Sequence, residues 1–516
     1  MLDFARLKTP PKHGDVLVTP DPPDCVAAVR ENAARLRDAD APVLGRTLGE
    51  WRRETRNRIA ECDDRPIIVI GHQPEFIHPG VWAKHVVADR LARVLGGKAI
   101  NLVVDNDSPK GTALHIPVVD QAGASLRTVR FPNPPPGQAY EQLPRLAATE
   151  IDPLRRAVRE AMGEHFAASP MPAFFDGLVG AREAADWVDQ MIAGCRGAER
   201  SFGVELTGVR VSRVWWSPLL ADLLLNAEKF ADAYNRALAW YRGEFRVRGS
   251  NRPIPDLARR GDEIELPIWA YRADEPRRRL YVARRGDDCV LAAERESITT
   301  LTASDLRSCG DLAGFLAERG GWRIRPRALT LTIWARLLLA DLFIHGIGGA
   351  KYDRISDRII ADYFGLVPPE MACVSATLHV FPASPLTDAE SVADLRSAIR
   401  YLTWNPQRNL PDNAALTPLV GGRVSTVRRS RELRELDPLN HAARRDAFRQ
   451  IREINERLLA ERPATLAELN ERLQHARHRR EDDRIAFDRE YFFAIHDRPA
   501  LEGLLAALPG PSSFRV

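Results

Sequence analysis

Cysteine and lysine are both scarce in this 516-residue chain. The six cysteines lie far apart and form no Cys-x-x-Cys pair, which argues against a cysteine zinc site or a disulfide framework. Seven lysines stand beside 67 arginines, yet 74 basic side chains meet 70 acidic ones, so the net charge is only +4. A general nucleic-acid-binding protein would show a basic stripe with interleaved aromatic residues, and we therefore expect no nucleic-acid partner.

Signals for export or membrane insertion are missing as well. The N-terminus has no apolar segment of signal-peptide length before Pro10 and Pro11. The most apolar run, residues 329–347, is interrupted by Arg336 and Asp341, and both charges are expensive in a bilayer. We expect a cytoplasmic protein that does not associate with membranes. Its 45% hydrophobic content indicates a globular chain, and its length indicates roughly two to four domains.

The sequence does contain a strand-loop-helix-strand pattern. Residues 65–70 form a short apolar run ending at Gly71, as in a strand buried on both faces. Helical spacing follows over 81–95, stops at Gly96, and gives way to a second apolar run at 99–104. This order opens a doubly wound sheet, in which ligands bind outside the carboxyl ends of the strands. We predict an α/β fold: a Rossmann-like doubly wound parallel sheet with helical insertions and a C-terminal α-helical coiled-coil hairpin.

Changes in composition suggest the domain boundaries. Residues 131–142 contain four prolines, which no central strand or helix tolerates. Beyond residue 426, apolar residues recur every three or four positions in 440–461 and again in 465–488, with Pro463 between them. Such helices predict an antiparallel hairpin or short coiled coil, and a surface through which a homodimer would form. The predicted domains are an N-terminal helical arm (1–60), the first half of the core (61–130), a helical insertion (131–205), the second half of the core with a small β element (206–425) and the helical hairpin (426–516).

The first candidate site is the loop after the first predicted strand. His72 and His78 lie six residues apart, and a helix begins at about Gly80. Imidazoles and free backbone N–H groups at a helix N-terminus favour an anion. We predict that His72 is catalytic and stabilises phosphate or carboxylate charge, and that His78, Gly80 and Lys84 bind the substrate or nucleotide. The alternative is that both histidines merely satisfy loop carbonyl groups.

The second candidate is the acidic cluster after the second strand, where Asp105 and Asp107 lie two residues apart. Carboxylates at the end of a parallel strand can bind a substrate amine, hold a ribose or Mg²⁺, or act as a base. Asx-Pro clusters are also ordinary turn formers. We predict that Asp105 is catalytic and positions the amine, and that Asp107, the more turn-like of the two, contributes to binding.

The third candidate is a glycine-rich helix entry. Gly348 and Gly349 let the backbone approach a ligand, and Lys351 and Tyr352 follow at once. The segment does not match the Walker pattern, and a tight turn that needs positive φ is the alternative. We predict binding roles for these four residues and no metal site formed by the protein.

Together these segments resemble one family, the bacillithiol biosynthesis cysteine-adding enzymes. Residues 71–84 resemble that family's glycine-bounded loop with a lysine at its end, and 103–107 its strand ending in an acidic cluster. Residues 327–353 resemble its long apolar segment leading to a Gly-Gly motif. The charged helices after residue 426, with aromatic residues 491–493 near their end, are similar to its C-terminal coiled coil.

The resemblance implies a Rossmann-like core related to class I nucleotidyltransferases and a C–N ligation that joins L-cysteine to the amine of a glucosaminyl malate. His72 and His78 would take the place of the histidine-bearing nucleotide loop, Asp105 or Asp107 would face the substrate, and ATP or ADP with Mg²⁺ is the implied cofactor. Ala350-Lys351 stands where the family has Pro-x-Glu, which allows a different small-molecule substrate. The alternatives are a nucleotidyltransferase-like enzyme of the HIGH superfamily and a non-catalytic ligand-binding protein that self-associates through its C-terminal helices.

Overall fold

The chain forms two compact units in a computed structural model. The described residues are 7–61, 64–109, 111–120, 123–131, 135–214, 216–245, 254–308, 311–381, 392–408, 414–437, 439–461 and 463–515. The core unit comprises Met1–Ile116, Leu126–Val380 and Arg489–Val516, and the helical unit comprises Pro117–Ser125 and Phe381–Asp488. The helical unit therefore begins well before residue 426, and the last part of the chain returns to the core unit.

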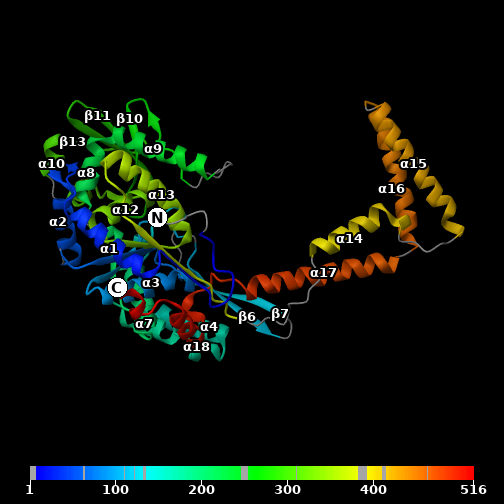
Figure 1. Ribbon diagram of the computed structural model, residues 1–516, viewed down its shortest axis with the longest axis horizontal. Coiled ribbons are helices and arrows are strands. Elements are labelled where there is room, and N and C mark those ends of the chain that lie inside the picture. Colours follow the sequence, from blue (N-terminus) through cyan, green and yellow to red (C-terminus); the bar gives the residue numbers. More distant parts are fainter. Residues whose placement is uncertain are drawn as a thin grey trace. The chain divides into compact units, whose positions relative to one another are not determined.

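A six-stranded sheet lies at the centre of the core unit (Figure 1). Its strands, in spatial order, are β1 (Val16–Thr19), β16 (Met371–Ala376), β15 (Leu342–His345), β4 (Ile67–His72), β5 (Lys98–Val103) and β8 (Thr207–Arg210). Every neighbouring pair is parallel except β1 with β16, which is antiparallel. The α/β class and the parallel sheet are thus confirmed. The strands predicted at 65–70 and 99–104 are β4 and β5, and the helix predicted between them is α3 (Pro79–Val94).

The apolar sequence of β4 explains its central place. Ile67, Ile68, Val69 and Ile70 are fully buried, and side chains alternate between the two faces of a strand. Ile68 and Ile70 join the hydrophobic core that contains α3, whereas Ile67 and Val69 join the core on the opposite face. A strand covered on both faces needs this continuous apolar run rather than an alternating pattern.

The first 60 residues belong to this core rather than to a separate arm, because β1 pairs with β16. The other elements on this stretch are α1 (Pro22–Arg37), β2 (Pro42–Val43), β3 (Arg46–Thr47) and α2 (Leu48–Ala60). Between β5 and β8 lie β6 (Ala113–Asp120), β7 (Gly123–Arg130), α4 (Ala148–Met162), α5 (His165–Ala168), α6 (Met171–Gly180) and α7 (Trp187–Arg200). After β8 come α8 (Ser217–Leu225) and α9 (Ala227–Glu244), which are separated by Asn226.

A second, antiparallel sheet occupies the segment between β8 and β15. Its order is β13 (Glu296–Leu301), β12 (Asp288–Ala293), β11 (Arg278–Arg285), β10 (Glu263–Tyr271) and β14 (Arg323–Pro326), with β9 (Arg259–Arg260) pairing on β10. The helices α10 (Ala303–Ser308), α11 (Leu312–Gly320) and α12 (Ala328–Trp334) accompany it. The chain then enters β15, α13 (Ile347–Ile359) and β16, and it ends with α18 (Arg498–Ala507).

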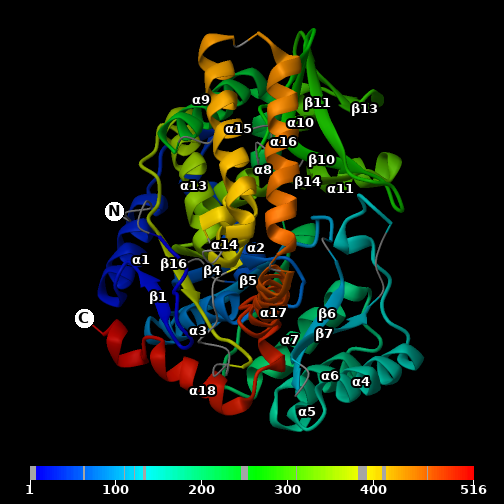
Figure 2. The same cartoon turned by 90° about the vertical axis from the view of Figure 1, so that its right-hand side faces the viewer.

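The helical unit contains four long helices: α14 (Val392–Trp404), α15 (Thr417–Leu436), α16 (His441–Ala460) and α17 (Pro463–Ala486). The predicted pairing of 440–461 with 465–488 was wrong. Helix α16 packs along α15 instead, as Figure 2 shows, because a short connection folds one back on the other. Helix α17 packs on α14, where Leu395 and Leu473 are buried together.

The charges inside the apolar run 329–347 have a structural explanation. The run forms α12, a π-helical turn at Ala335–Leu339 and β15, and both Arg336 and Asp341 are buried in ion pairs. Among the described residues, no helix combines the length and the apolar character needed to cross a bilayer.

Candidate functional site

The strand order places two of the predicted loops next to each other. The chain runs from β4 to β5 and β8 on one side of β4, then returns to add β15 and β16 on the other side. The order therefore reverses between β4 and β15, whose carboxyl ends meet because Ile344 pairs with Ile70. The loop to α3 leaves the first strand and the entry to α13 leaves the second. In open parallel sheets, ligands bind in the crevice at such a reversal.

His72 and His78 hold opposite tautomers at this edge. The Nδ1 atom of His72 lies 3.0 Å from the carbonyl oxygen of Gln73, and because a carbonyl only accepts, Nδ1 carries the proton. His78 is the N-cap residue of α3, and its Nδ1 accepts a hydrogen bond from the backbone N–H of Gly80 at 3.1 Å. The proton of His78 is therefore on Nε2. His78 is the better donor to an anion, whereas Nε2 of His72 carries a lone pair.

Both imidazoles are held neutral. Burial lowers the pKa of His72 to about 3, with a further contribution from the charge of Lys84. Burial also lowers the pKa of His78 to about 3, and the charges of Arg489 and Lys84 act in the same direction. Glycine is required at position 80, because a Cβ there would lie 2.7 Å from the carbonyl oxygen of Ala376.

Lys84 is a buried lysine on the first turns of α3. Its side chain reaches the strand end, where Nζ donates a hydrogen bond of 3.1 Å to the carbonyl oxygen of Gly71. The residue is only 3% exposed, and burial lowers the pKa of the ammonium group to about 8. A lysine whose charge is poorly solvated attracts an anion that replaces the lost water.

The charges of Lys84 and Lys351 both act on one thiol, that of Cys373. Burial raises the pKa of the Cys373 thiol to about 12, and the charges of Lys84 on α3 and Lys351 on α13 both oppose that rise. Cys373 lies on β16 opposite His345 of β15. The structure thus brings together the first and third predicted loops. Gly348 and Gly349 lie in the first turn of α13, and Tyr352, 39% exposed, follows them.

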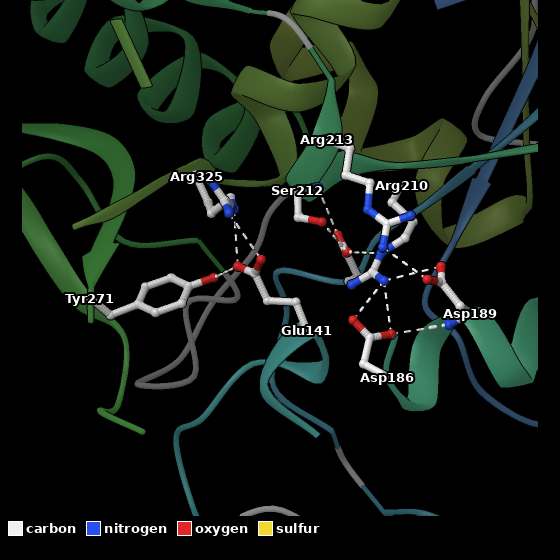
Figure 3. Close-up of polar contacts among 9 residues, drawn as sticks. Glu141, Asp186, Asp189, Arg210, Ser212, Arg213, Tyr271 and Arg325 are labelled. Atoms are coloured by element: carbon white, nitrogen blue, oxygen red, sulfur yellow. Dashed lines mark hydrogen bonds and ion pairs between the residues drawn. The ribbon is translucent and has the colours of Figure 1, made fainter. Parts of the chain in front are cut away.

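Asp105 lies on the same edge of the sheet but is enclosed by protein partners, among them Arg210 and Ser212, which are labelled in Figure 3. Its carboxylate pairs with Arg210 at 2.7 Å and accepts hydrogen bonds from the backbone N–H and the hydroxyl of Ser212. Burial raises the pKa of Asp105, with a further contribution from Glu141, while Arg210 and Ser212 oppose the rise. Arg210 also bonds Asp186 and Asp189 on or beside α7. These contacts support a structural role, and the catalytic role stays a prediction.

Asp107 is the accessible carboxylate of the pair. Its side chain is 39% exposed, and it accepts hydrogen bonds from Gln73 at 3.1 Å and from Arg277 at 2.7 Å. Gln73 immediately follows His72, so this aspartate is linked to the histidine loop. The geometry favours Asp107 over Asp105 for contact with a ligand, the reverse of the order expected from the sequence.

Two clusters of polar side chains near this edge were not predicted as site residues. Glu141 pairs with Arg325 at 2.9 Å and accepts a hydrogen bond from the hydroxyl of Tyr271, as Figure 3 shows. At the end of β15, His345 contacts the carboxylate of Asp353. The only sequence signal for the second pair was a histidine directly before the glycines of α13.

The edge offers nitrogen donors for an anionic group but no set of metal ligands. Within the described ranges, no cluster of three or more His, Cys, Asp or Glu side chains has the geometry to hold a metal ion. The neutral N–H of His78 and the ammonium groups of Lys84 and Lys351 suit phosphate or carboxylate oxygens. A cavity of about 280 Å³ is lined by Trp240, Glu370 and Met371. Met371 is the first residue of β16, so this cavity lies at the amino end of the strand, away from the edge described above.

Comparison with known proteins leaves the family open: no family model matches the chain, and no curated protein matches it.

Proposed function

We propose that the chain is a C–N ligase with a Rossmann-like core that joins an amino acid to the amine of an anionic small molecule. The observation that carries the proposal is that the loop into α3 and the entry to α13 leave neighbouring strands where the strand order reverses, with Lys84 on the first helix and Lys351 on the second. Two lysines beside such a crevice would neutralise a phosphate or carboxylate group. The strand order, with β4 first and later strands added on both sides, is the order of dinucleotide-binding sheets.

The sequence resemblance to bacillithiol cysteine-adding enzymes supports the choice of reaction. Its histidine loop and its Gly-Gly segment are the two loops that lie together here. Under this proposal His78, Lys84 and Lys351 bind the anionic part of the substrate or of ATP or ADP. Asp107 receives the amine, and Gly348 and Gly349 allow backbone N–H groups to approach the ligand, while Gly80 lets α3 begin close to Ala376.

A product assay tests the reaction. The purified chain is incubated with ATP, Mg²⁺, L-cysteine and a glucosaminyl malate, and the condensed amide is sought by mass spectrometry. We expect product from the unaltered chain, none from Lys351→Met, and a full yield from Lys12→Met, which replaces an exposed lysine.

Binding measurements separate the alternatives. Calorimetric titration with ATP and with inorganic pyrophosphate should show binding that Lys351→Met abolishes. Binding without any amide product would favour the nucleotidyltransferase-like alternative or a ligand-binding protein. If the Lys351→Met and Lys12→Met variants bind both probes equally, the proposed anion site is wrong.

Self-association through the helical unit remains a second proposal. Leu436 and Leu439, near the connection between α15 and α16, are 83% and 82% exposed. Sedimentation equilibrium of the full chain should give a dimer mass, and replacement of both leucines by serine should give a monomer. A monomer mass for the unaltered chain would rule out self-association through the helical unit.

A further inference from the structure

His345 and Asp353 form a buried pair at the carboxyl end of β15. The imidazole Nε2 lies 3.0 Å from Oδ2 of Asp353, and the two side chains are 7% and 2% exposed. Asp353 lies on α13, eight residues later, so the first turns of that helix bring the carboxylate back to the strand end. Neither residue belongs to the histidine loop or to the acidic cluster described above.

The chemistry of Asp353 determines which imidazole nitrogen carries the proton. Burial alone would raise the pKa of this carboxyl, but the charge of Arg336 and the hydrogen bond from His345 hold its pKa well below the ordinary value. Arg336 pairs with the same Oδ2 atom at 2.6 Å and is itself 1% exposed. An ionised carboxylate only accepts hydrogen bonds, so Nε2 of His345 must donate. In the neutral ring, Nδ1 then carries the lone pair.

Gly349 lies directly against that lone pair. A Cβ at position 349 would lie 2.9 Å from Nδ1 of His345, closer than non-bonded carbon and nitrogen atoms approach. A Cβ on the neighbouring Gly348, in the same helical turn, would meet nothing within 4 Å. Glycine is therefore required at position 349, because any side chain there would cover Nδ1 of His345. No hydrogen bond to Nδ1 is found among the residues that the structure describes.

His345 also lies at the reversal of strand order. Its neighbour on β15, Ile344, pairs with Ile70, so His345 is beside the end of β4. Side chains alternate along a strand, which places His345 on the same face as Phe343, whereas His72 shares the face of Ile68 and Ile70. The two histidines thus border the strand ends from opposite faces. The crevice between the two loops is where the ligand is expected.

We propose that His345 is the proton acceptor of this site and that Asp353 is its positioning residue. The proposal rests on the proposed C–N ligation, with an acyl phosphate or acyl adenylate as the electrophile. The amine nitrogen of the substrate forms a bond to the acyl carbon and passes its proton to Nδ1. The bond from that carbon to the phosphate oxygen breaks, and its electron pair leaves with the phosphate. Asp353 stabilises the imidazolium that forms, as a carboxylate does for a catalytic histidine.

Chemical labelling tests the geometry without any substrate. Diethyl pyrocarbonate transfers a carbethoxy group to an unprotonated imidazole nitrogen, and peptide mass spectrometry follows each histidine separately. We expect labelling of His345 to slow in Gly349→Ala by about tenfold, which corresponds to a barrier raised by about 1.4 kcal/mol. Gly348→Ala should leave the His345 rate unchanged, and the exposed His115 serves as an internal reference in all three proteins. Alanine favours helix more than glycine does, so both variants should fold.

A second measurement addresses the tautomer. In protein labelled with ¹⁵N-histidine, the signals assigned by comparison with His345→Gln should show a proton on Nε2 and none on Nδ1. A proton on Nδ1, equal labelling rates in the two glycine variants, or no labelling of His345 while His115 reacts would each overturn the proposal. These readouts do not depend on turnover. If they agree with the proposal while no amide product forms, the ligase reaction is refuted and the histidine-aspartate pair is retained.

Discussion

Lys84 should reduce the stability of the folded chain at neutral pH, and replacing it with methionine should reveal by how much. Burial lowers the pKa of this lysine from its ordinary 10.5 to about 8. This difference corresponds to about 3 kcal/mol lost on folding while the ammonium is charged. Methionine has a similar length and no charge. It also forfeits the hydrogen bond to the carbonyl oxygen of Gly71, worth about 1 kcal/mol. The expected net gain for Lys84→Met is about 2 kcal/mol at pH 7.

The stability gained by Lys84→Met should shrink with rising pH in a defined window. Below pH 8 the lysine is protonated in both the folded and the unfolded chain, so the full cost applies. Between pH 8 and 10.5 the unfolded chain holds the proton and the folded chain loses it, so stability rises with pH and the cost disappears. The advantage of the methionine variant should therefore fall below about 1 kcal/mol at pH 9.5.

Guanidinium unfolding followed by tryptophan fluorescence measures this difference. Trp82 lies on the same helix and stacks on Phe493 at 5.0 Å, and it contributes to the combined emission of the chain's ten tryptophans. Lys12→Met, at an exposed position, should shift the midpoint at neither pH. A gain for Lys84→Met that is the same at pH 7 and pH 9.5, or a loss at pH 7, would refute the reasoning from burial.

Three further substitutions test two buried carboxylates of the core unit and one partly exposed carboxylate by the same unfolding assay. Asp341→Asn should cost about 3 to 5 kcal/mol, because Arg52 and Arg56 would remain buried without their charged partner; a cost below 1 kcal/mol would contradict this. Asp105→Asn should also destabilise by about 3 kcal/mol, since this residue is fully buried against its arginine partner. Asp107→Asn should change stability by less than about 1 kcal/mol, because the side chain is 39% exposed. The same variant should weaken binding of the amine substrate in a calorimetric titration, and unchanged binding would remove Asp107 from the site.

The elements around the first loop could be predicted from sequence because their signals are local. The apolar run of β4, the glycines after α3 and the second run at β5 each specify one element without reference to the rest of the chain. Helix α3 begins where a proline occupies the first turn, an ordinary start signal. The meeting of the histidine loop with the glycine-rich entry is not local. It depends on β15 returning to pair with β4 across some 270 residues, and no periodicity encodes that pairing.

The geometry favours Asp107 over Asp105 for ligand contact for a related reason, while the catalytic role of Asp105 stays a prediction. Both residues follow β5, and the sequence distinguished them only by the more turn-like setting of Asp107. What distinguishes them is Arg210 at the end of β8, which lies beside β5 and takes up the first carboxylate. The helical hairpin also could not be predicted from local sequence alone. The amphipathic pattern of α16 was visible, but its partner depends on which neighbouring helix offers an apolar face, and that helix is α15.

The two charges inside the apolar run 329–347 fix the strand that carries His345. Asp341, directly before β15, is held by Arg52 and Arg56 and accepts a hydrogen bond from the backbone of β4. Arg336, one turn earlier, holds Asp353, which in turn contacts His345 after the strand. Buried ion pairs rarely add stability over apolar packing, so we infer that these pairs serve to hold β15 and His345 in place. With both ends of a four-residue strand tied to buried charges, the imidazole has little freedom to move relative to Gly349, as a proton acceptor of defined tautomer requires.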